Sequence, residues 1–357
     1  MTNKEPTIVV KQEIKKIDNT NPYIHDVVCL IGAMETDAHN NEPTLFTDIE
    51  KAREAYGTDA SIDGNSALEI LLDGDEISGL LVVNITTMSG ETAQRNLTEL
   101  KLKDALNSLD LIDFDTLYIA SDLTDTFIEK VKEFTDKRFE SKNPMGYTCA
   151  VNRTSVSAYE TTAEKVGDFC YALINQKLNV DNEDLTLVES GAFVTKQIAL
   201  TPISDSLTAK EIPEITGLQD TYLFGKDGNG NNNDGKILTG VGYLLFRLIN
   251  ATTNTYEAVN SANHNGLDLY ISRSRDVIVK EFALRSFLGD KTQPKTIELV
   301  KMECNRLYSR FKSLGIIEGM NYAVQKADAE TVDVIINTIQ FAGVITTINV
   351  SITVEVV

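Results

Sequence analysis

VVCLIGAMETDAHNNEPTLFTDIEKAREAYG, residues 27–57, begins with a run of six residues that is almost entirely apolar. A run of this kind is typical of a β-strand that is buried on both faces of a sheet. The segment Thr47–Gly57 predicts a helix, in which Thr47 caps the first turn, Glu50 completes a capping box and Gly57 ends the helix. A buried strand that leads into a helix indicates an α/β unit.

Expected helices and strands alternate further along the chain. We expect a helix at Ala67–Leu72 and a strand at Leu80–Ile85. The next expected helices are Leu97–Asn107, Asp125–Phe139 and Thr161–Leu178, and the next strands are Thr116–Ala120, Tyr147–Val151 and Leu185–Val188. This order predicts an α/β domain with a mostly parallel, mixed sheet, in a chain that is α+β overall.

Beyond this domain the pattern becomes irregular and then helical. The Asn- and Gly-rich run Lys226–Lys236 predicts a surface loop. We then expect a strand at Leu267–Ile271, a helix at Asp276–Leu288 and a long helix from Pro294 to Leu314. These elements predict a C-terminal α+β domain.

The long helix has two distinct faces. Apolar residues recur along it every three or four positions and predict one buried stripe, made of Ile297, Val300, Cys304, Leu307, Phe311 and Leu314. Lys295, Arg306 and Arg310 fall on the opposite face. Taken alone, these cations are those of an ordinary solvated helix surface.

Both ends of the chain contain strand-like runs. The last run, Val344–Val357, alternates apolar and polar residues, whereas the first, Thr7–Ile14, is short. The apolar members are Ile8, Val10 and Ile14 at the N-terminal end and Ile348, Val350, Ile352, Val354 and Val356 at the C-terminal end. Such strands either pair within their own domain or add to the sheet of another subunit.

We divide the chain accordingly into four segments. Residues 1–20 form an N-terminal strand arm and linker, and residues 21–205 form the α/β domain. Residues 206–343 form the C-terminal domain, and residues 344–357 form a C-terminal strand arm. A chain of 357 residues is long enough for two or three domains.

The charge balance excludes one class of partner. A formal net charge of −20 argues against direct binding of nucleic acid, which needs a clustered basic surface. The segment His264–Gly315 nevertheless holds ten basic and six acidic residues, which indicates an acidic partner surface at this place. We expect no membrane insertion, because the apolar runs are short and the N-terminal residues lack the apolar core of a secretory signal.

Motifs for metals, cofactors and catalysis are weak or missing. Four widely spaced cysteines and three histidines favour buried free thiols over a zinc site or a disulfide framework. Asp227, Asn229 and Asn231 match the first ligands of an EF-hand loop, but Asn232 replaces its glycine and Leu238 its final glutamate. We predict no metal, no cofactor and no catalytic residues, since nucleotide-binding and hydrolase motifs are also missing.

Two stretches resemble the sheath proteins of contractile phage tails and R-type bacteriocins. One is residues 27–57, with a buried strand, a Pro-Thr segment and a helix that closes in Tyr56-Gly57. The other is LDLYISRSRDVIVKEFALRSFLGDKTQPKTIELVKMECNRLYSRFKSLGIIEG, with Arg273 and Asp276. The segment Gly217–Asn265 between them follows the family pattern poorly.

The resemblance implies a structural subunit, not an enzyme. It implies that both terminal arms donate strands to neighbouring subunits through hinges near Lys15–Asn21 and Gly319–Glu330. It also implies that Lys295, Arg306 and Arg310 face a tail tube. The implied partners are further copies of the chain in stacked rings, the tail tube protein, and baseplate and tail terminator proteins. Assembly would take place in the bacterial cytoplasm, as part of a virion tail or a tail-like particle.

Other functions stay open at this point. A cytoplasmic α/β enzyme would need a pocket with convergent polar groups. Another self-assembling or surface-layer protein would share the strand-like ends, but a surface layer requires export. The residues alone do not decide between these classes.

Overall fold

The computed structural model describes residues 27–75, 77–283, 294–327, 332–341, 347–348 and 352–355. For residues 75, 294–295, 347–348 and 352–355 it describes the backbone alone. The predicted arm at Thr7–Ile14 and the predicted hinge at Lys15–Asn21 lie outside the described residues.

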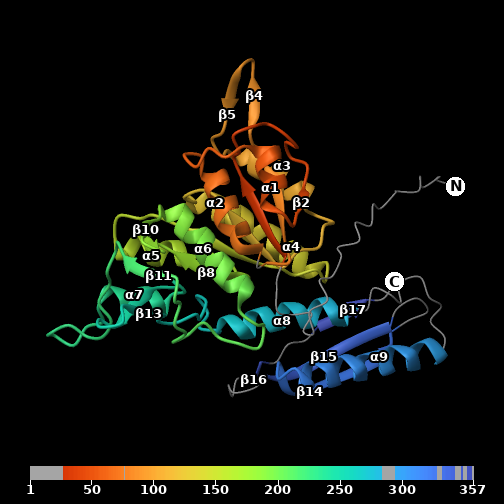
Figure 1. Cartoon of the computed structure of the whole chain (residues 1–357). Coiled ribbons are helices and arrows are strands. Elements are labelled where there is room, and N and C mark those ends of the chain that lie inside the picture. Colours follow the sequence, from red (N-terminus) through yellow and green to blue (C-terminus); the bar gives the residue numbers. More distant parts are fainter. Residues whose placement is uncertain are drawn as a thin grey trace.

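A central sheet with the order β2-β3-β1-β6-β7-β8 organises the first half of the chain (Figure 1). All neighbours in it are parallel except β2, which runs antiparallel to β3. Its strands are β1 (Val27–Gly32), β2 (Thr44–Phe46), β3 (Gly79–Asn84), β6 (Thr116–Ile119), β7 (Gly146–Ala150) and β8 (Cys170–Ile174). The prediction of an α/β fold with a mixed, mostly parallel sheet is confirmed.

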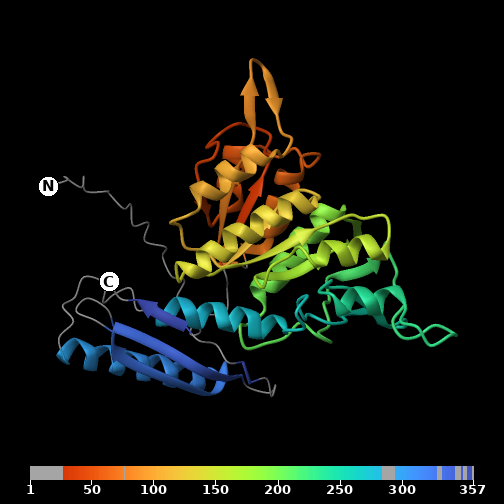
Figure 2. The ribbon, with the colours of Figure 1, turned by 180° about the vertical axis from the view of Figure 1, so that it is seen from behind.

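Helices cover both faces of this sheet, as Figure 2 shows from behind. They are α1 (Ile49–Tyr56), α2 (Asp63–Leu72), α3 (Glu99–Ser108), α4 (Asp125–Glu140), α5 (Val156–Ala163) and α6 (Leu187–Leu200), with a short 3-10 turn at Asp73–Asp75. Cys29 and Ile31 of β1 share a core with α3, α4 and α5, whereas Val28 and Leu30 share one with α1, α2 and α6. Burial on both faces explains why β1 is apolar throughout.

Three local predictions in this half are wrong. The α1 helix is capped by Asp48, whose side chain accepts a hydrogen bond from the Glu50 amide, and not by Thr47. The expected helix at Thr161–Leu178 is instead the end of α5 followed by β8, because its apolar run fills the last place in the parallel sheet. The expected strand at Leu185–Val188 is the start of α6, where Thr186 and Glu189 form a capping box.

The segment after α6 packs mainly against the same unit. It contains β11 (Ile215–Leu218), α7 (Asp234–Gly240), β12 (Phe246–Asn250) and β13 (Thr255–Ala258), and β11 pairs with β9 (Leu178–Val180), which also pairs with β10 (Glu183–Asp184). Leu238, Tyr243 and Leu245 belong to the core on the α3–α5 face of the sheet. We therefore propose that the C-terminal domain starts near α8 and not at residue 206.

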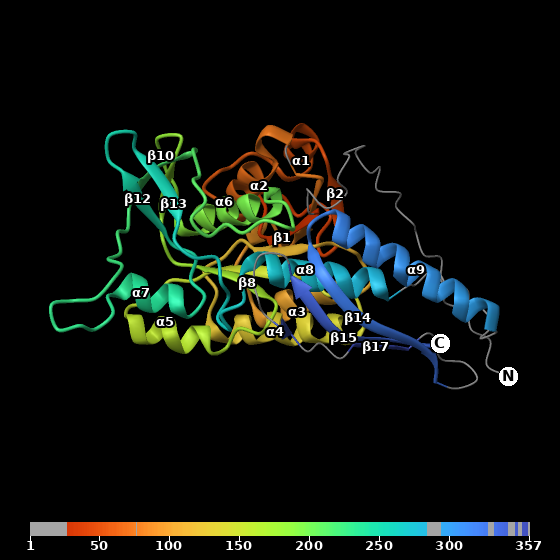
Figure 3. The same ribbon diagram turned by 90° about the horizontal axis from the view of Figure 1, so that it is seen from below.

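The C-terminal unit has its own core. Its elements are α8 (Leu269–Phe282), α9 (Pro294–Ser313), β14 (Ile317–Lys326), β15 (Val332–Phe341), β16 (Thr347–Ile348) and β17 (Ile352–Glu355). Figure 3 shows α8 and α9 beside the β14–β15 ribbon. The predicted stripe on α9 is confirmed: Val300, Cys304, Leu307 and Phe311 are buried, and Ile297 and Leu314 pack against the same core.

Two predictions for this unit are wrong. The expected strand at Leu267–Ile271 is instead the start of α8, which begins at Leu269 and also contains the start of the expected following helix. Asp268 caps α8 by accepting a hydrogen bond from the Tyr270 amide. Most of the expected hinge at Gly319–Glu330 is β14, whose residues alternate between the core and the opposite face. Met320, Tyr322 and Val324 pack on the core, which holds this segment in the sheet.

Candidate assembly surfaces

The C-terminal strand pairs within its own chain. β15 pairs antiparallel with β14 on one side and with β17 and β16 on the other. In the β15–β17 register, Asp333 lies opposite Glu355 and Ile336 lies opposite Ile352. The sequence left open whether this strand pairs within its own domain or with another subunit. In the single chain it pairs within its own domain.

The predicted strand-arm residues are distributed as follows. Ile348 lies in β16, and Ile352 and Val354 lie in β17. The remaining predicted positions lie outside the described residues: Ile8, Val10, Ile14, Val350 and Val356. Exchange of these strands between subunits stays a prediction.

The ribbon of β14 and β15 rests on α8 and α9 through one apolar face. Val332, Val334, Ile336, Ile339 and Phe341 of β15 are buried in this core. On its other edge, β14 pairs with no strand in the part of the chain that the structure describes. A ten-residue edge strand of this kind is a ready template for another strand.

The outer face of α9 carries part of the predicted basic patch. Arg306 forms an ion pair with Glu303, with Nε 2.9 Å from Oε2, and Arg310 follows one turn later. The hydrogen bond from Arg306 lowers the pKa of Glu303. The structure describes only the backbone of Lys295.

Two exposed apolar residues lie near these cations. Leu299 and Met302 are among the large exposed hydrophobic side chains of the described chain. They fall on the same side of α9 as Arg306, since positions three, four and seven apart share a helix face. The outer face of α9 therefore carries exposed apolar side chains as well as charged ones.

Helix α8 ties the C-terminal unit to the central sheet through Lys280. Its ammonium group lies 3.0 Å from Asp115 Oδ1 and 3.0 Å from Asp113 Oδ1, and it donates to the Phe114 carbonyl at 2.8 Å. Burial acts to raise the pKa of Asp115, but the charge of Lys280 and the hydrogen bond from the Val27 amide outweigh it and lower the pKa. Burial acts to lower the pKa of Lys280, and the two carboxylates raise it.

A second set of polar contacts binds α8 to the end of β8. Tyr171 donates a hydrogen bond to Asp276 Oδ2 at 2.9 Å, and Arg275 donates to Asp276 Oδ1 at 2.8 Å. The Arg275 guanidinium also stacks over Phe169, 4.5 Å from the ring centroid. Arg273 donates to the Thr201 carbonyl at 2.6 Å. Polar groups this deeply buried hold one arrangement of the two units, because each loses its partners if they separate.

The loop that resembled a calcium site is occupied by its own hydrogen bonds. Asp227 Oδ1 accepts from the amides of Asn229 and Asn231, each at 2.8 Å. Across the described ranges, no cluster of three or more histidine, cysteine, aspartate or glutamate side chains could hold a metal ion. Among the same residues, no helix combines the length and apolar character needed to cross a membrane, and all four cysteines are free and buried.

Comparison with known proteins identifies the fold. No family model and no curated protein matches the sequence. The crystal structure of a sheath tail protein from Desulfitobacterium hafniense superposes with a TM-score of 0.69, at 11% sequence identity, and the match covers 99% of this chain and 100% of that one. The chain has the fold of a tail sheath protein. A sheath tail protein from Listeria innocua gives a TM-score of 0.71 at 11% identity, over 93% of this chain and 95% of that one.

Within this sheath-type fold, the sequence located one part of the contact between units and missed another. Arg273 and Asp276 stood out in the sequence only as part of the resemblance, and both are buried on α8. Lys280 and Asp115 were missed. The available signal was the spacing of Arg273, Asp276 and Lys280 by three and four residues within an apolar helix, which places all three on one face.

Proposed function

We propose that this chain is the structural subunit of a contractile tail sheath. Its subunits would stack as rings around a tail tube, stay linked by exchanged strands, and contract to drive the tube through a target envelope. The observation that carries the proposal is the fold, which matches sheath tail proteins over nearly the whole length of both chains. Fold alone does not fix function, so the surfaces described above provide the second line of support.

The hairpin of β15 with β16 and β17 supports strand exchange. Only residues 342–346 connect β15 to β16. If these five residues extend, they span roughly 17 Å, and β17 can then pair with β15 of a neighbouring subunit in the same register. Such an exchange keeps every strand contact and changes only which chain supplies it, as in domain swapping.

The open edge of β14 offers a place for the second arm. We infer that the N-terminal arm of a neighbouring subunit, with Ile8, Val10 and Ile14, adds to this edge. Pairing there would cover the backbone groups that β14 leaves without a strand partner among the described residues. Each C-terminal sheet would then join three subunits.

The outer face of α9 is the proposed contact with the tube. Arg306 and Arg310, together with Lys295, would meet carboxylates, while Leu299 and Met302 add apolar contact. Exposed ion pairs contribute only about 0–1 kcal/mol each, so this contact can break during contraction. The strand links, with several backbone hydrogen bonds each, would persist.

The proposed rigid body for contraction is the central sheet together with α8. Lys280 and Asp276 hold α8 to the sheet through polar contacts with Asp115 and Tyr171, and Arg275 stacks over Phe169. Movement between subunits would therefore be taken up by the arms and not by this contact. The other proposed partners are baseplate and tail terminator proteins, in a particle assembled in the bacterial cytoplasm.

Electron microscopy of the purified full chain tests this function. We expect striated hollow cylinders in negative stain. A variant that lacks residues 346–357 should stay folded by circular dichroism and should form no cylinders. Cylinders of normal length from this variant would refute strand exchange, and a wild-type chain that forms none, alone or with a tube protein, would refute the sheath function.

A cysteine pair across β15 and β17 separates the two pairing modes. Asp333 and Glu355 lie opposite each other in the register, so Asp333→Cys with Glu355→Cys can form a disulfide in either mode. In exchanged strands the disulfide joins different chains and gives a ladder on a denaturing gel. In the single-chain hairpin it gives only monomers.

A further inference from the structure

The β4–β5 hairpin projects from one end of the central sheet and carries an exposed tip. β4 (Thr87–Ser89) and β5 (Thr92–Gln94) pair antiparallel, and they point away from the body in both views (Figures 1 and 2). At the tip, Met88 is 46% exposed, and Glu91 is exposed beside it. Two strands of three residues are at best marginally stable alone in water, so a hairpin with an apolar exposed tip indicates a contact partner.

The base of the hairpin is held firmly while its tip is not. Arg95, directly after β5, donates to the Met34 carbonyl at 3.1 Å and to the Glu35 carbonyl at 2.8 Å. No residue of Thr87–Gln94 belongs to any core of the described chain. The hairpin therefore has a fixed direction and a free end.

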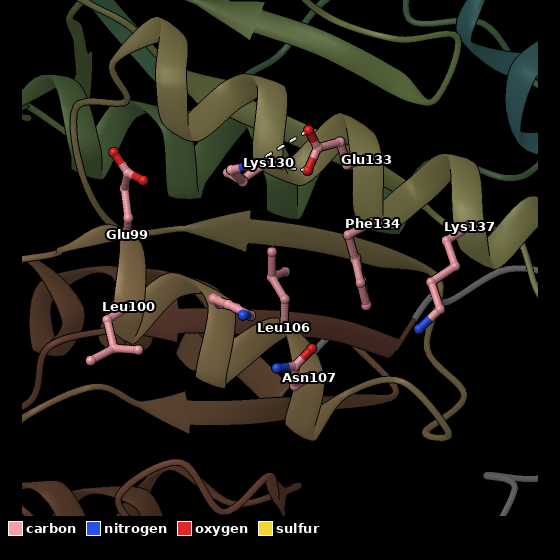
Figure 4. Close-up of a pocket in the computed structure, with 9 residues that line it drawn as sticks. Glu99, Leu100, Leu106, Asn107, Lys130, Glu133, Phe134 and Lys137 are labelled. Carbon is pink, nitrogen blue, oxygen red and sulfur yellow. Dashed lines mark hydrogen bonds and ion pairs between the residues drawn. The ribbon is translucent and has the colours of Figure 1, made fainter.

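A groove of about 500 Å³ lies between α3 and α4 on the same unit (Figure 4). Its floor contains the buried side chains of Leu106 and Phe134, and its rim contains Leu100, which is 68% exposed. An apolar floor beside a large exposed apolar side chain is a typical protein contact surface.

The rim of the groove also offers a cation. Lys130 pairs with Glu133, and Lys137 pairs with Asp110. Lys103 lines the groove too, and it makes no ion pair within the described ranges. The groove thus combines apolar contact area with one available ammonium group.

We propose that the hairpin tip of one copy docks in the α3–α4 groove of a second copy. Met88 would pack on Leu106 and Phe134, where its sulfur can contact the aromatic ring. Glu91 would pair with Lys103. The proposal deepens the proposed sheath function, on which it rests, by assigning a lateral contact between subunits.

The occupant must come from another copy. Only residues 95–98 separate β5 from α3, and the tip points away from α3, so the tip cannot enter the groove of its own chain. A contact between two different surfaces closes into a dimer only if two copies make it reciprocally across a two-fold axis. Otherwise it continues into a ring or a helix, which is the symmetry that a sheath requires.

Disulfide trapping on the purified full chain tests the contact. The variant Glu91→Cys with Lys103→Cys, which replaces the proposed ion pair, should give disulfide-linked multimers beyond the dimer, because each chain supplies one tip and one groove. The matched control is Glu91→Cys with Glu54→Cys, which places the second thiol on the exposed surface of α1. The four native cysteines are buried and do not interfere. Absence of multimers, or equal yields from both variants, would overturn the proposal.

Charge exchange gives an independent readout. Glu91→Lys should raise the concentration needed for polymerisation by about two- to fivefold, as expected for loss of one exposed ion pair. Adding Lys103→Glu should restore the wild-type value. If the single variant polymerises like the wild type, the assigned pair is wrong. If the wild type forms cylinders and these variants behave like it, only this contact is refuted. If the cysteine variant gives trapped multimers but the wild type forms no cylinders, the sheath function is refuted and the contact is retained.

Discussion

Replacing Lys280 by methionine removes the charge that ties α8 to the central sheet and keeps most of the side-chain volume. The Lys280 side chain is only 16% exposed, and it contacts Asp113, Asp115 and the Phe114 carbonyl. The variant leaves these three acceptors without their donor. The loss of unfolding free energy depends on how far water can replace the ammonium group as the donor.

The two carboxylates differ in this respect. Asp113 is 69% exposed and contributes little, because exposed ion pairs are worth about 0–1 kcal/mol. Asp115 is 36% exposed and keeps its hydrogen bond from the Val27 amide at 3.0 Å. Since water reaches part of Asp115, we reduce the 3–5 kcal/mol typical of a fully buried broken pair to about 2 kcal/mol of unfolding free energy.

Urea unfolding followed by circular dichroism measures this change, since the chain has no tryptophan to report by fluorescence. The matched control is Lys301→Met, which breaks an exposed pair with Glu298 on α9 and should cost less than about 0.5 kcal/mol. Adding Asp115→Asn to Lys280→Met should recover part of the loss, because it removes the unpaired charge. A cost for Lys280→Met no larger than that of the control would refute our account of α8.

The pH dependence of the same difference follows from the pKa shifts. The pKa of Asp115 is lowered in the folded state, so its contribution is complete above the unfolded value of 3.8 and is lost as the pH falls through the folded value. The pKa of Lys280 is raised, so its contribution is complete below 10.5 and is lost only in stronger alkali. The difference between wild type and variant should therefore be constant near neutrality and shrink below about pH 4.

Three further predictions concern packing, thiols and the tube contact. Gly146→Ala should lower the free energy of unfolding by about 1–3 kcal/mol, because the added Cβ would lie 2.0 Å from the Tyr171 ring. Gly228→Ala, with open space around it, should change this free energy little. Equal losses for the two variants in urea unfolding would contradict this prediction. All four thiols should resist Ellman's reagent in the native chain and react with it in guanidinium, because they are buried. Burial also raises the pKa of Cys304 to about 12. Rapid reaction of the native chain would show that a core opens readily. Reversing the charges of Lys295, Arg306 and Arg310 should weaken assembly on a tube several-fold and leave tube-free polymers unchanged by electron microscopy; unchanged assembly on the tube would mean that this face is only solvated.

The sequence predicted those elements whose burial pattern is local. The strand at Val27–Gly32 has apolar residues on both faces, and α9 has a single apolar stripe, so periodicity was sufficient for each. The alternating strands and helices from residue 80 to 150 were also correct within a few residues. The glycine at the end of α1, Gly57, with its positive φ of 83°, was a reliable stop signal.

The errors came from elements whose identity depends on distant partners. β8 is a short apolar run that fits a helix equally well, and only its place beside β7 makes it a strand. The resemblance implied a hinge at Gly319–Glu330, but pairing with β15 makes most of this segment the strand β14. The prediction of a strand at Leu185–Val188 was avoidable, because Thr186 and Glu189 match the pattern of a capping box, which indicates the start of a helix.

The candidate surfaces could also be predicted only where a local pattern encodes them. The basic face of α9 could be read from its spacing, but the exposure of Leu299 and Met302 could not, because it depends on what the rest of the fold leaves uncovered. The contact of Lys280 with Asp115 joins residues 165 positions apart in the chain. No local pattern encodes a pair of that separation.

The self-paired C-terminal strand has a kinetic consequence for the proposed polymer. A subunit whose β17 already covers β15 must first undo its own hairpin before it can link to a neighbour, and the pairing energy regained is nearly the pairing energy given up. Free subunits would therefore persist in solution with a lag before growth, and a preformed end that presents an open β15 edge would act as a seed. Sheath length would then be controlled by where growth is seeded, and polymers that form without a seed would appear only after the lag.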